Sequence, residues 1–176
     1  NRLGLLRWGL IPPWADDEKI GAKMINARAE TLKERPAYRE AYRRKRCLVP
    51  ADGFYEWKAL PEGGKRPYRI VLRSGEPFSM AAIYETWQAP DGRKIGSCSI
   101  VTTEPNELMA GIHNRMPVIL KRNDEAMWLN RDITSTDRLD ELLVPYPADE
   151  MRAYAVDKRV GNAAFDDADC LREVPE

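Results

Sequence analysis

The hydrophobic positions of the chain fall mainly into short runs that are typical of β-strands. The runs are rich in apolar and aromatic residues, and they cover residues 5–11, 47–57, 68–72, 78–87 and 95–103, with further strands expected over 116–120 and 151–156. Pro50 and Gly53 interrupt the second run and indicate a bend or bulge there. The turn sequences 74–76 and 89–92 separate later runs by short spacers. Short spacers predict antiparallel neighbours.

Helical patterns are few and short. We expect peripheral helices over residues 36–46, 105–110, 124–130 and 135–142. The first begins with Pro36 and ends on basic residues, as the helix dipole favours, and its residues Tyr38, Ala41 and Tyr42 share one face. The pattern therefore predicts an α+β fold, with a twisted, mainly antiparallel sheet that closes toward a barrel or sandwich and carries short peripheral helices.

Composition narrows the function classes. The 176 residues are enough for one domain. The 28 Lys and Arg residues balance the 28 Asp and Glu residues, which excludes a protein that binds polyanions through its overall charge. Any contact with nucleic acid therefore needs a local basic patch. Cys47, Cys98 and Cys170 are far apart and lack Cys-x-x-Cys spacing, which argues against a disulfide framework and fits a reducing, cytoplasmic setting. The sequence contains no signal-peptide pattern and no apolar run long enough for a membrane span.

Three polar residues interrupt apolar or aromatic sequence, and they are the candidates for chemistry. Asn26 follows Met24-Ile25, Glu56 lies between Tyr55 and Trp57, and His113, the only histidine, follows Ile112. An ionisable group in such a run is either desolvated or paired, and both conditions shift its pKa. One amide, one carboxyl and one imidazole are sufficient for a proton-transfer centre if the fold brings them together.

Each candidate also has a plain structural interpretation. Glu56 lies on the strand face opposite its aromatic neighbours, so it is either a general acid/base in a groove or an ordinary surface carboxylate. His113 shares a face with Arg115 in extended chain, where the pair would suit an anionic target, although a lone histidine is often structural and Arg115 could form a surface ion pair. Asn26 beside Arg28 fits substrate orientation and phosphate binding, or Asn26 simply caps a helix.

Aromatic and basic residues offer weaker signals. Most of the five tryptophans, Trp8, Trp14, Trp57, Trp87 and Trp128, should be core residues. Trp14 lies in a loop that we expect to be exposed, and it is either a base-stacking wedge or a loop anchor. The basic stretch 35–46 is expected to be a solvated helix face rather than a phosphate site.

No metal site or cofactor is expected. One histidine and three dispersed cysteines do not make a zinc site, and the sequence has no His-Glu-x-x-His. It also has neither a phosphate-cradling glycine loop nor a nucleophile elbow.

Four motifs, taken together and in order, resemble the SOS response-associated peptidase (SRAP) family from about Leu5 to about Asn162. They are Trp-Gly-Leu-Ile-Pro-Pro-Trp at 8–14, Ile-Asn-Ala-Arg-Ala-Glu-Thr at 25–31, Arg-Cys-Leu-Val-Pro-Ala-Asp-Gly-Phe-Tyr-Glu-Trp at 46–57 and Ile-His-Asn-Arg-Met-Pro at 112–117. The resemblance implies binding of single-stranded DNA that carries an abasic site. It further implies that an N-terminal cysteine forms a thiazolidine DNA–protein crosslink and cleaves off the protein's own propeptide where one exists.

The resemblance also implies residue roles. The family's catalytic asparagine, glutamate and histidine match Asn26, Glu56 and His113. The residues that match its DNA-binding positions are Arg28, Arg115, Trp14, Trp57 and Thr102. The implied setting is the DNA damage response, with a cytoplasmic protein that joins the nucleoid when it binds DNA. We expect a monomer with no obligate protein partner.

The sequence departs from the family pattern at its start. Residue 1 is Asn, and the family's Met-Cys-Gly-Arg opening is not in the chain. We therefore expect residues 1–176 to form a single, N-terminally incomplete SRAP-like domain that does not crosslink DNA by itself. Cys47 precedes a strand-like Leu48-Val49, so we interpret it as a structural residue. Two alternatives remain open, a single-stranded DNA-binding module without chemistry and a self-processing cysteine peptidase.

Overall fold

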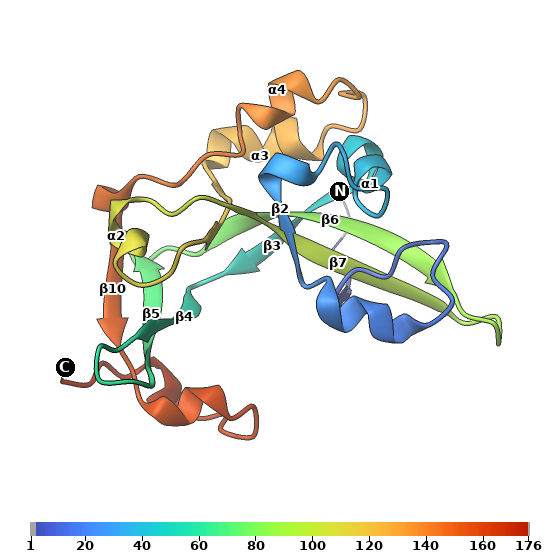
Figure 1. The fold of residues 1–176 in the computed structure, drawn as a ribbon. Coiled ribbons are helices and arrows are strands. Elements are labelled where there is room, and N and C mark those ends of the chain that lie inside the picture. Colours follow the sequence, from blue (N-terminus) through green and yellow to red (C-terminus); the bar gives the residue numbers. More distant parts are fainter. Residues whose placement is uncertain (1–2, 176) are drawn as a thin grey trace. The chain divides into compact units, whose positions relative to one another are not determined.

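The structure, a computed structural model, describes residues 3–175 and has an α+β fold with mixed sheets and short helices (Figure 1). The α-helices are α1 (Arg39–Arg44), α2 (Glu107–Ala110), α3 (Arg122–Leu129) and α4 (Asp137–Asp140). Short 3₁₀ helices are η1 (Glu18–Lys23), η2 (Ala29–Thr31), η3 (Ala148–Glu150), η4 (Lys158–Gly161) and η5 (Ala168–Leu171). All four predicted helices are present. Three of them are shorter than the predicted ranges, whereas α3 begins two residues earlier and ends one residue earlier than predicted.

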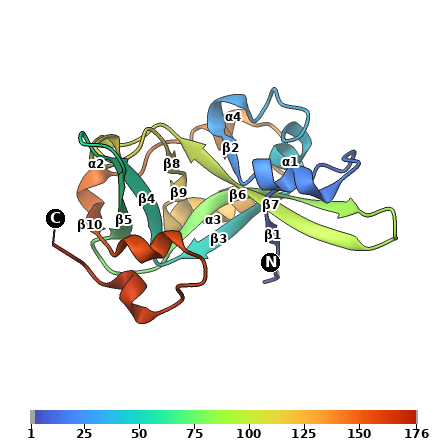
Figure 2. The same ribbon diagram turned by 60° about the horizontal axis from the view of Figure 1, so that its bottom comes forward.

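The larger sheet is built around a long hairpin. Strands β6 (Phe78–Gln88) and β7 (Lys94–Thr103) pair antiparallel and lie side by side in Figures 1 and 2. The other strands of this sheet are β1 (Arg7–Trp8), β2 (Asn26–Arg28), β3 (Arg46–Ala51), β8 (Met116–Pro117) and β9 (Ile119–Leu120).

Strands β1 and β2 both pair with β7 in parallel, so the larger sheet is mixed. The antiparallel pairing predicted from short spacers is confirmed for β6 and β7, but it is wrong for β5 (Lys65–Leu72) and β6, which lie in different sheets. A parallel neighbour needs a long connection, and the chain supplies one because more than sixty residues separate Arg28 from Lys94.

The smaller sheet has three antiparallel strands in the order β10-β5-β4. These are β10 (Met151–Ala155), β5 (Lys65–Leu72) and β4 (Phe54–Ala59). Pairing within each sheet is open-ended among residues 3–175, and closure toward a barrel or sandwich stays a prediction.

The predicted bend at 50–53 separates β3 from β4. A side chain at Gly53 would place its Cβ 2.9 Å from the carbonyl oxygen of Ile70, so the chain approaches β5 too closely for any residue but glycine. The second hydrophobic run is therefore two strands rather than one.

By its contacts the chain groups into two compact units. The first contains residues 3–49, 79–103 and 117–144, and the second contains residues 50–78, 104–116 and 145–175. The core of the first unit includes the predicted face of α1, because Tyr38, Ala41 and Tyr42 are all buried. Tyr42 also packs against Trp128, with ring centroids 5.9 Å apart. The prediction of a single domain stays open.

Arg46 corrects the expectation of a solvated basic stretch. It is 5% exposed, and its guanidinium donates to the five carbonyl oxygens of Tyr42, Arg43, Trp128, Asn130 and Ile133. A buried cation is tolerated only when its donors are satisfied. Arg46 therefore joins the end of α1 to the end of α3 and the loop that follows it. Within residues 3–175 no helix is long and apolar enough to cross a bilayer.

Candidate functional site

Strand β4 carries Glu56 into a partly enclosed position. Its side chain is 24% exposed, and the residue lies opposite Tyr68 of β5. Burial raises the pKa of the Glu56 carboxyl, although His113, a backbone hydrogen bond from Trp57 and the charge of Lys65 act in the opposite direction. A carboxyl in this condition does not fit the alternative of a fully solvated surface group.

His113 is the partner of Glu56 within the second unit. Its Nδ1 lies 3.6 Å from Oε1 of Glu56. The residue lies between helix α2 and strand β8, as predicted, and its backbone N–H donates to the carbonyl oxygen of Met109. Helix α2 is itself fixed, because the side chain of Asn106 caps its N-terminus through the N–H of Met109 at 2.9 Å. A capped turn and a buried Met109 thus hold the histidine backbone in place.

The groups around Nδ1 of His113 can accommodate two protonation states of the ring. The backbone N–H of Arg115 can donate to Nδ1 over 3.2 Å, and the carbonyl oxygen of Arg115 lies 3.1 Å from the same atom. In the neutral ring that accepts from Arg115, the proton is on Nε2, which is then a donor. In the protonated ring, Nδ1 can donate to the carbonyl oxygen of Arg115 and form an ion pair with Glu56. The pair can therefore hold one proton in more than one place.

Trp57 and Arg115 belong to the same unit and are half-buried. Because side chains alternate along a strand, Trp57 lies on the face of β4 opposite Glu56. Any contact of Trp57 with DNA would therefore take place on the other face of this strand.

Strand β2 carries the candidates of the first unit. Asn26 and Arg28 are exposed, whereas Ala27 between them is fully buried. They lie opposite Ile100 and Thr102 of β7, so Asn26, Arg28 and Thr102 share one face of the sheet. The alternative role of Asn26 as a helix cap is wrong, because Asn26 starts a strand and Arg28 is the residue that precedes helix η2.

Trp14 is 61% exposed and is not packed into the core. Its loop is held by other groups, because the N–H of Ala15 donates to the carbonyl oxygen of Pro12 and Nε1 of Trp87 donates to the carbonyl oxygen of Ala15 over 2.7 Å. The structure thus favours an exposed aromatic on a fixed loop over a core anchor.

Sequence reasoning missed Trp8, since of the five tryptophans only Trp14 and Trp57 were indicated as functional. It is 57% exposed, and its Nε1 donates to the carbonyl oxygen of Ile25 over 2.9 Å. Trp8 lies opposite Cys98 on β7, two residues before the partner of Asn26, so it is on the same sheet face as Asn26. Trp8 lies in the apolar run 5–11, and hydropathy alone does not distinguish a buried strand from an exposed one.

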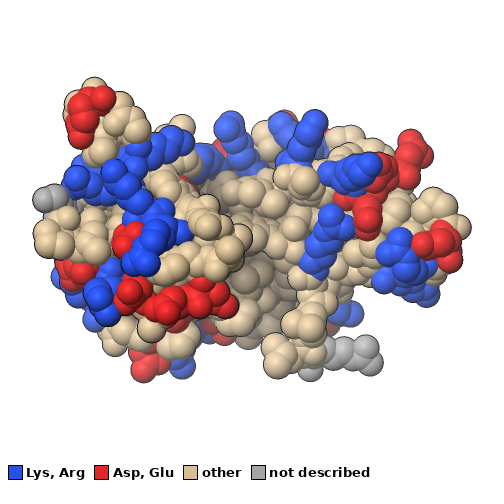
Figure 3. Space-filling model, turned by 90° about the horizontal axis from the view of Figure 1, so that it is seen from below, with Lys and Arg blue, Asp and Glu red and all other residues tan. Residues whose placement is uncertain are grey.

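The environment of Cys47 fits its interpretation as a structural residue. Burial raises the pKa of the Cys47 thiol to about 12 and also raises that of Cys98, so neither is a ready thiolate. Figure 3 shows Lys and Arg side chains with Asp and Glu side chains close beside them. Within residues 3–175 no group of three or more His, Cys, Asp or Glu side chains is placed to hold a metal ion.

The geometry can now be set beside known proteins. Residues 1–163 match the family model described as SOS response associated peptidase (SRAP). The chain belongs to the SRAP family. The match covers the strands that carry Asn26, Arg28 and Glu56 and the turn that carries His113.

Relatives within the SRAP family are similar over nearly the whole chain. The abasic site processing protein YoqW of Bacillus subtilis is 57% identical over 92% of this chain and 72% of its own length. The abasic site processing protein HMCES of Xenopus tropicalis is 31% identical over 98% of this chain and 57% of its own length. A solved structure of a protein from Bacteroides thetaiotaomicron matches with a TM-score of 0.88 and 34% identity, over 96% of this chain and 76% of that chain.

Proposed function

We propose that this SRAP protein recognises abasic sites in single-stranded DNA and, in its full-length form, joins to them covalently through a cysteine that precedes residue 1. Family membership and the names of the relatives, abasic site processing proteins, support the substrate. The observation that carries the chemistry is the partly buried Glu56 carboxyl, whose raised pKa and 3.6 Å distance from His113 suit proton transfer.

The reaction requires proton movements that this pair is suited to perform. The abasic sugar opens to an aldehyde, and the α-amine of the cysteine attacks the carbonyl carbon. Loss of water then gives an imine, and the thiol adds to the imine carbon to close the thiazolidine ring. Glu56 would move the proton that opens the sugar, and His113 would donate a proton to the oxygen that leaves as water.

Other residues would bind and orient. The Asn26 amide would hold the cysteine, while Arg28 and Arg115 would neutralise phosphates beside the abasic site. Trp14 and Trp57 would contact exposed bases, and Thr102 would contribute a hydroxyl beside Arg28. A shared site for Asn26, Glu56 and His113 is part of this proposal.

Intact-mass measurement tests the proposal. Protein that begins with an added Cys-Gly-Arg segment is incubated with single-stranded DNA that carries one abasic site, and a covalent adduct is expected. The chain as it stands should give none. Cys47→Ser in the extended protein should leave the yield unchanged, because only a cysteine with a free α-amine closes the ring.

The alternatives give different results. Tight, strand-selective binding without any adduct in the extended protein would favour a binding module. Loss of an added leader sequence from in front of the cysteine, without reaction with DNA, would favour a self-processing peptidase. An adduct of the unextended chain that Cys47→Ser abolishes would overturn the assignment of the nucleophile.

A further inference from the structure

Strand β4, which carries Glu56, lies at an edge of the three-stranded sheet. Among residues 3–175 its one pairing partner is β5. Edge strands are less constrained than central ones, and general acid–base chemistry depends on placement to within about 0.5 Å. Something other than strand pairing must therefore fix β4 if Glu56 is to stay at His113.

The C-terminal segment supplies that support from the face of β4 opposite Glu56. Oη of Tyr55, the residue before Glu56, donates to the carbonyl oxygen of Cys170 over 3.0 Å. On the other edge of the sheet, Oη of Tyr154 in β10 donates to the next carbonyl oxygen, that of Leu171, over 3.2 Å. Two consecutive carbonyls of one turn are thus held by tyrosines from both edge strands.

Arg69 of the central strand β5 ties this arrangement together. It lies opposite both Tyr55 and Tyr154, so the three side chains form a row across one face of the sheet. Nη1 of Arg69 donates to Oη of Tyr154 over 2.8 Å, and Nη2 donates to the carbonyl oxygen of Asp52 over 3.2 Å. Asp52 lies in the bend that precedes β4, so the row also fixes the entry to this strand.

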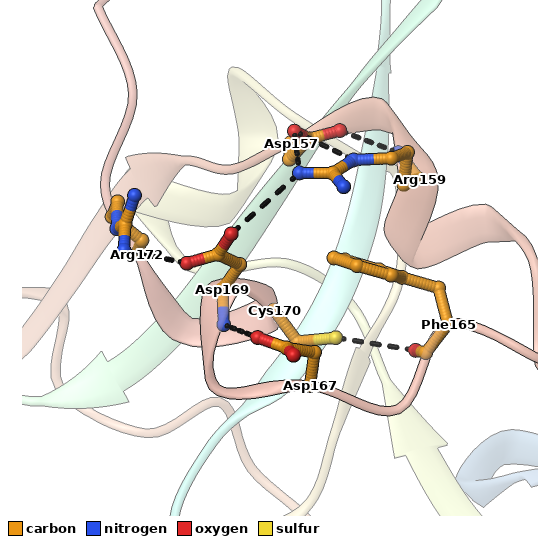
Figure 4. Close-up of polar contacts among 7 residues, drawn as sticks. All are labelled: Asp157, Arg159, Phe165, Asp167, Asp169, Cys170 and Arg172. Carbon is orange, nitrogen blue, oxygen red and sulfur yellow. Dashed lines mark hydrogen bonds and ion pairs between the residues drawn. The ribbon is translucent and has the colours of Figure 1, made fainter.

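The segment has a defined shape of its own, as Figure 4 shows. Arg159 pairs with Asp157 at 2.8 Å and Asp169 at 3.7 Å, and its guanidinium lies 4.3 Å from the ring centroid of Phe165. Asp169 in turn pairs with Arg172 at 2.6 Å. Exposed ion pairs contribute little singly, but connected pairs around one arginine restrict a short loop.

Backbone contacts anchor the C-terminal end of the segment beside β10, from which the segment also starts. The N–H of Val174 donates to the carbonyl oxygen of Ala155 over 2.9 Å, and Val156 forms an isolated antiparallel bridge with Glu173. Arg152 pairs with Glu173 and lies 5.0 Å from the Tyr154 ring centroid. A cavity of about 490 Å³, lined by Tyr55, Phe165 and Cys170 among others, lies beside the turn.

We propose that residues 157–174 act as a clamp that positions Glu56, with Tyr55 and Tyr154 as the positioning residues that transmit it to strand β4. The inference rests on the proposed function of the Glu56–His113 pair. The tip of the clamp lies beyond residues 1–163, which match the family model, so a comparison of family motifs would not have found it.

The test compares Tyr55→Phe, Tyr154→Phe and the double variant with the unchanged chain. Each change removes one hydroxyl donor and keeps the ring. Without the clamp, β4 should open more often, so its backbone amides should exchange about fivefold faster, and water should reach Glu56. The raised pKa of Glu56 should then fall toward its ordinary value, as followed by carboxyl NMR, and the ring signals of His113, the only histidine, should change with it.

Tyr146→Phe is the matched control. Its hydroxyl donates to Oε2 of Glu150 over 3.0 Å in the same unit, whereas the hydrogen bonds to Cys170 and Leu171 within residues 3–175 come from Tyr55 and Tyr154. It should change neither β4 exchange nor the Glu56 titration. If the tyrosine variants lower the melting temperature but leave both readouts unchanged, the clamp only stabilises the fold and the proposal is wrong. If the double variant does not fold, the two single variants decide between these outcomes.

These measurements need no DNA, so they remain valid if the proposed function fails. In the extended protein with an N-terminal cysteine, Tyr55→Phe should also shift the pH profile of adduct formation, whereas Tyr146→Phe should not. An unchanged profile with a shifted Glu56 titration would mean that the clamp positions Glu56 but that Glu56 does not act in the slow step.

Discussion

Strands β2 and β4 both carry predicted site residues, but they present them in different environments. On β2, Asn26 and Arg28 are exposed and only Ala27 between them is buried. On β4, Glu56 is three-quarters covered, its pKa is raised by burial, and a histidine lies 3.6 Å away. Exposed charges suit the binding of a solvated polyanion, whereas a desolvated pair suits proton transfer. The difference predicts that changes in the two strands affect different measurements.

The largest effect is expected from Glu56→Gln in the extended, cysteine-bearing protein. The amide keeps the shape but cannot move a proton, so adduct formation should slow by about 10²–10⁴-fold if Glu56 acts in the slow step. Affinity for single-stranded DNA should be unchanged. Rates from intact mass, with Glu62→Gln as an exposed control on the neighbouring turn, check this. If affinity fell by the same factor as the rate, the assignment of proton transfer to β4 and of DNA binding to β2 would be wrong.

Trp14→Ala should mainly reduce binding. Stacking of a base on an exposed aromatic is worth about 1–3 kcal/mol, so affinity for single-stranded DNA should fall by about five- to 150-fold. Trp14→Phe should retain most of the affinity because the smaller ring still stacks. Fluorescence anisotropy with labelled single strands measures both. Equal losses for alanine and phenylalanine would point to a role in holding the loop.

Arg28→Ala should have a smaller effect that depends on salt. Loss of one phosphate contact should reduce the slope of log affinity against log salt by about 0.7 for a single strand. The adduct rate at saturating DNA should stay the same. Arg39→Ala removes the same charge from the exposed surface of α1 and serves as the control. Equal slopes for the two variants would show that Arg28 is an ordinary surface charge.

The smallest effect concerns stability and pH. Because the pKa of Glu56 is raised in the folded chain, its contribution to stability is fully present below the pKa of the unfolded chain and is lost as pH rises through the folded value. Glu56→Gln should therefore raise the melting temperature slightly at pH 7 to 8, and this gain should disappear near pH 4. Thermal unfolding across this pH range checks the sign. If Glu56→Gln lowered the melting temperature at neutral pH, the Glu56 carboxylate would be stabilised by its partners more than burial destabilises it.

Many features of the fold and of the candidate site could be predicted from the sequence because they depend on local sequence patterns. Alternating residues place Glu56 and Trp57 on opposite faces of a strand, and the four SRAP motifs identify the family. The parallel pairing of β1 and β2 could not be predicted, since nothing in a three-residue strand such as Asn26–Arg28 states which distant strand it joins. The clamp was also missed, because its tyrosine hydroxyls bind backbone carbonyls and carbonyls leave no sequence signal.

Arg46 was missed for a similar reason, since a basic helix end is normally solvated. Its five carbonyl partners surround the guanidinium much as water molecules surround a dissolved ion, and among residues 3–175 it forms no ion pair with a carboxylate. Added salt screens the interaction between two exposed charges, but it has little effect on the interaction of a buried ion with the backbone carbonyl dipoles around it. The connection that Arg46 makes between α1 and α3 should therefore not weaken as ionic strength rises. Salt titrations of DNA binding can then be interpreted as counterion release, without a concurrent loosening of this part of the protein.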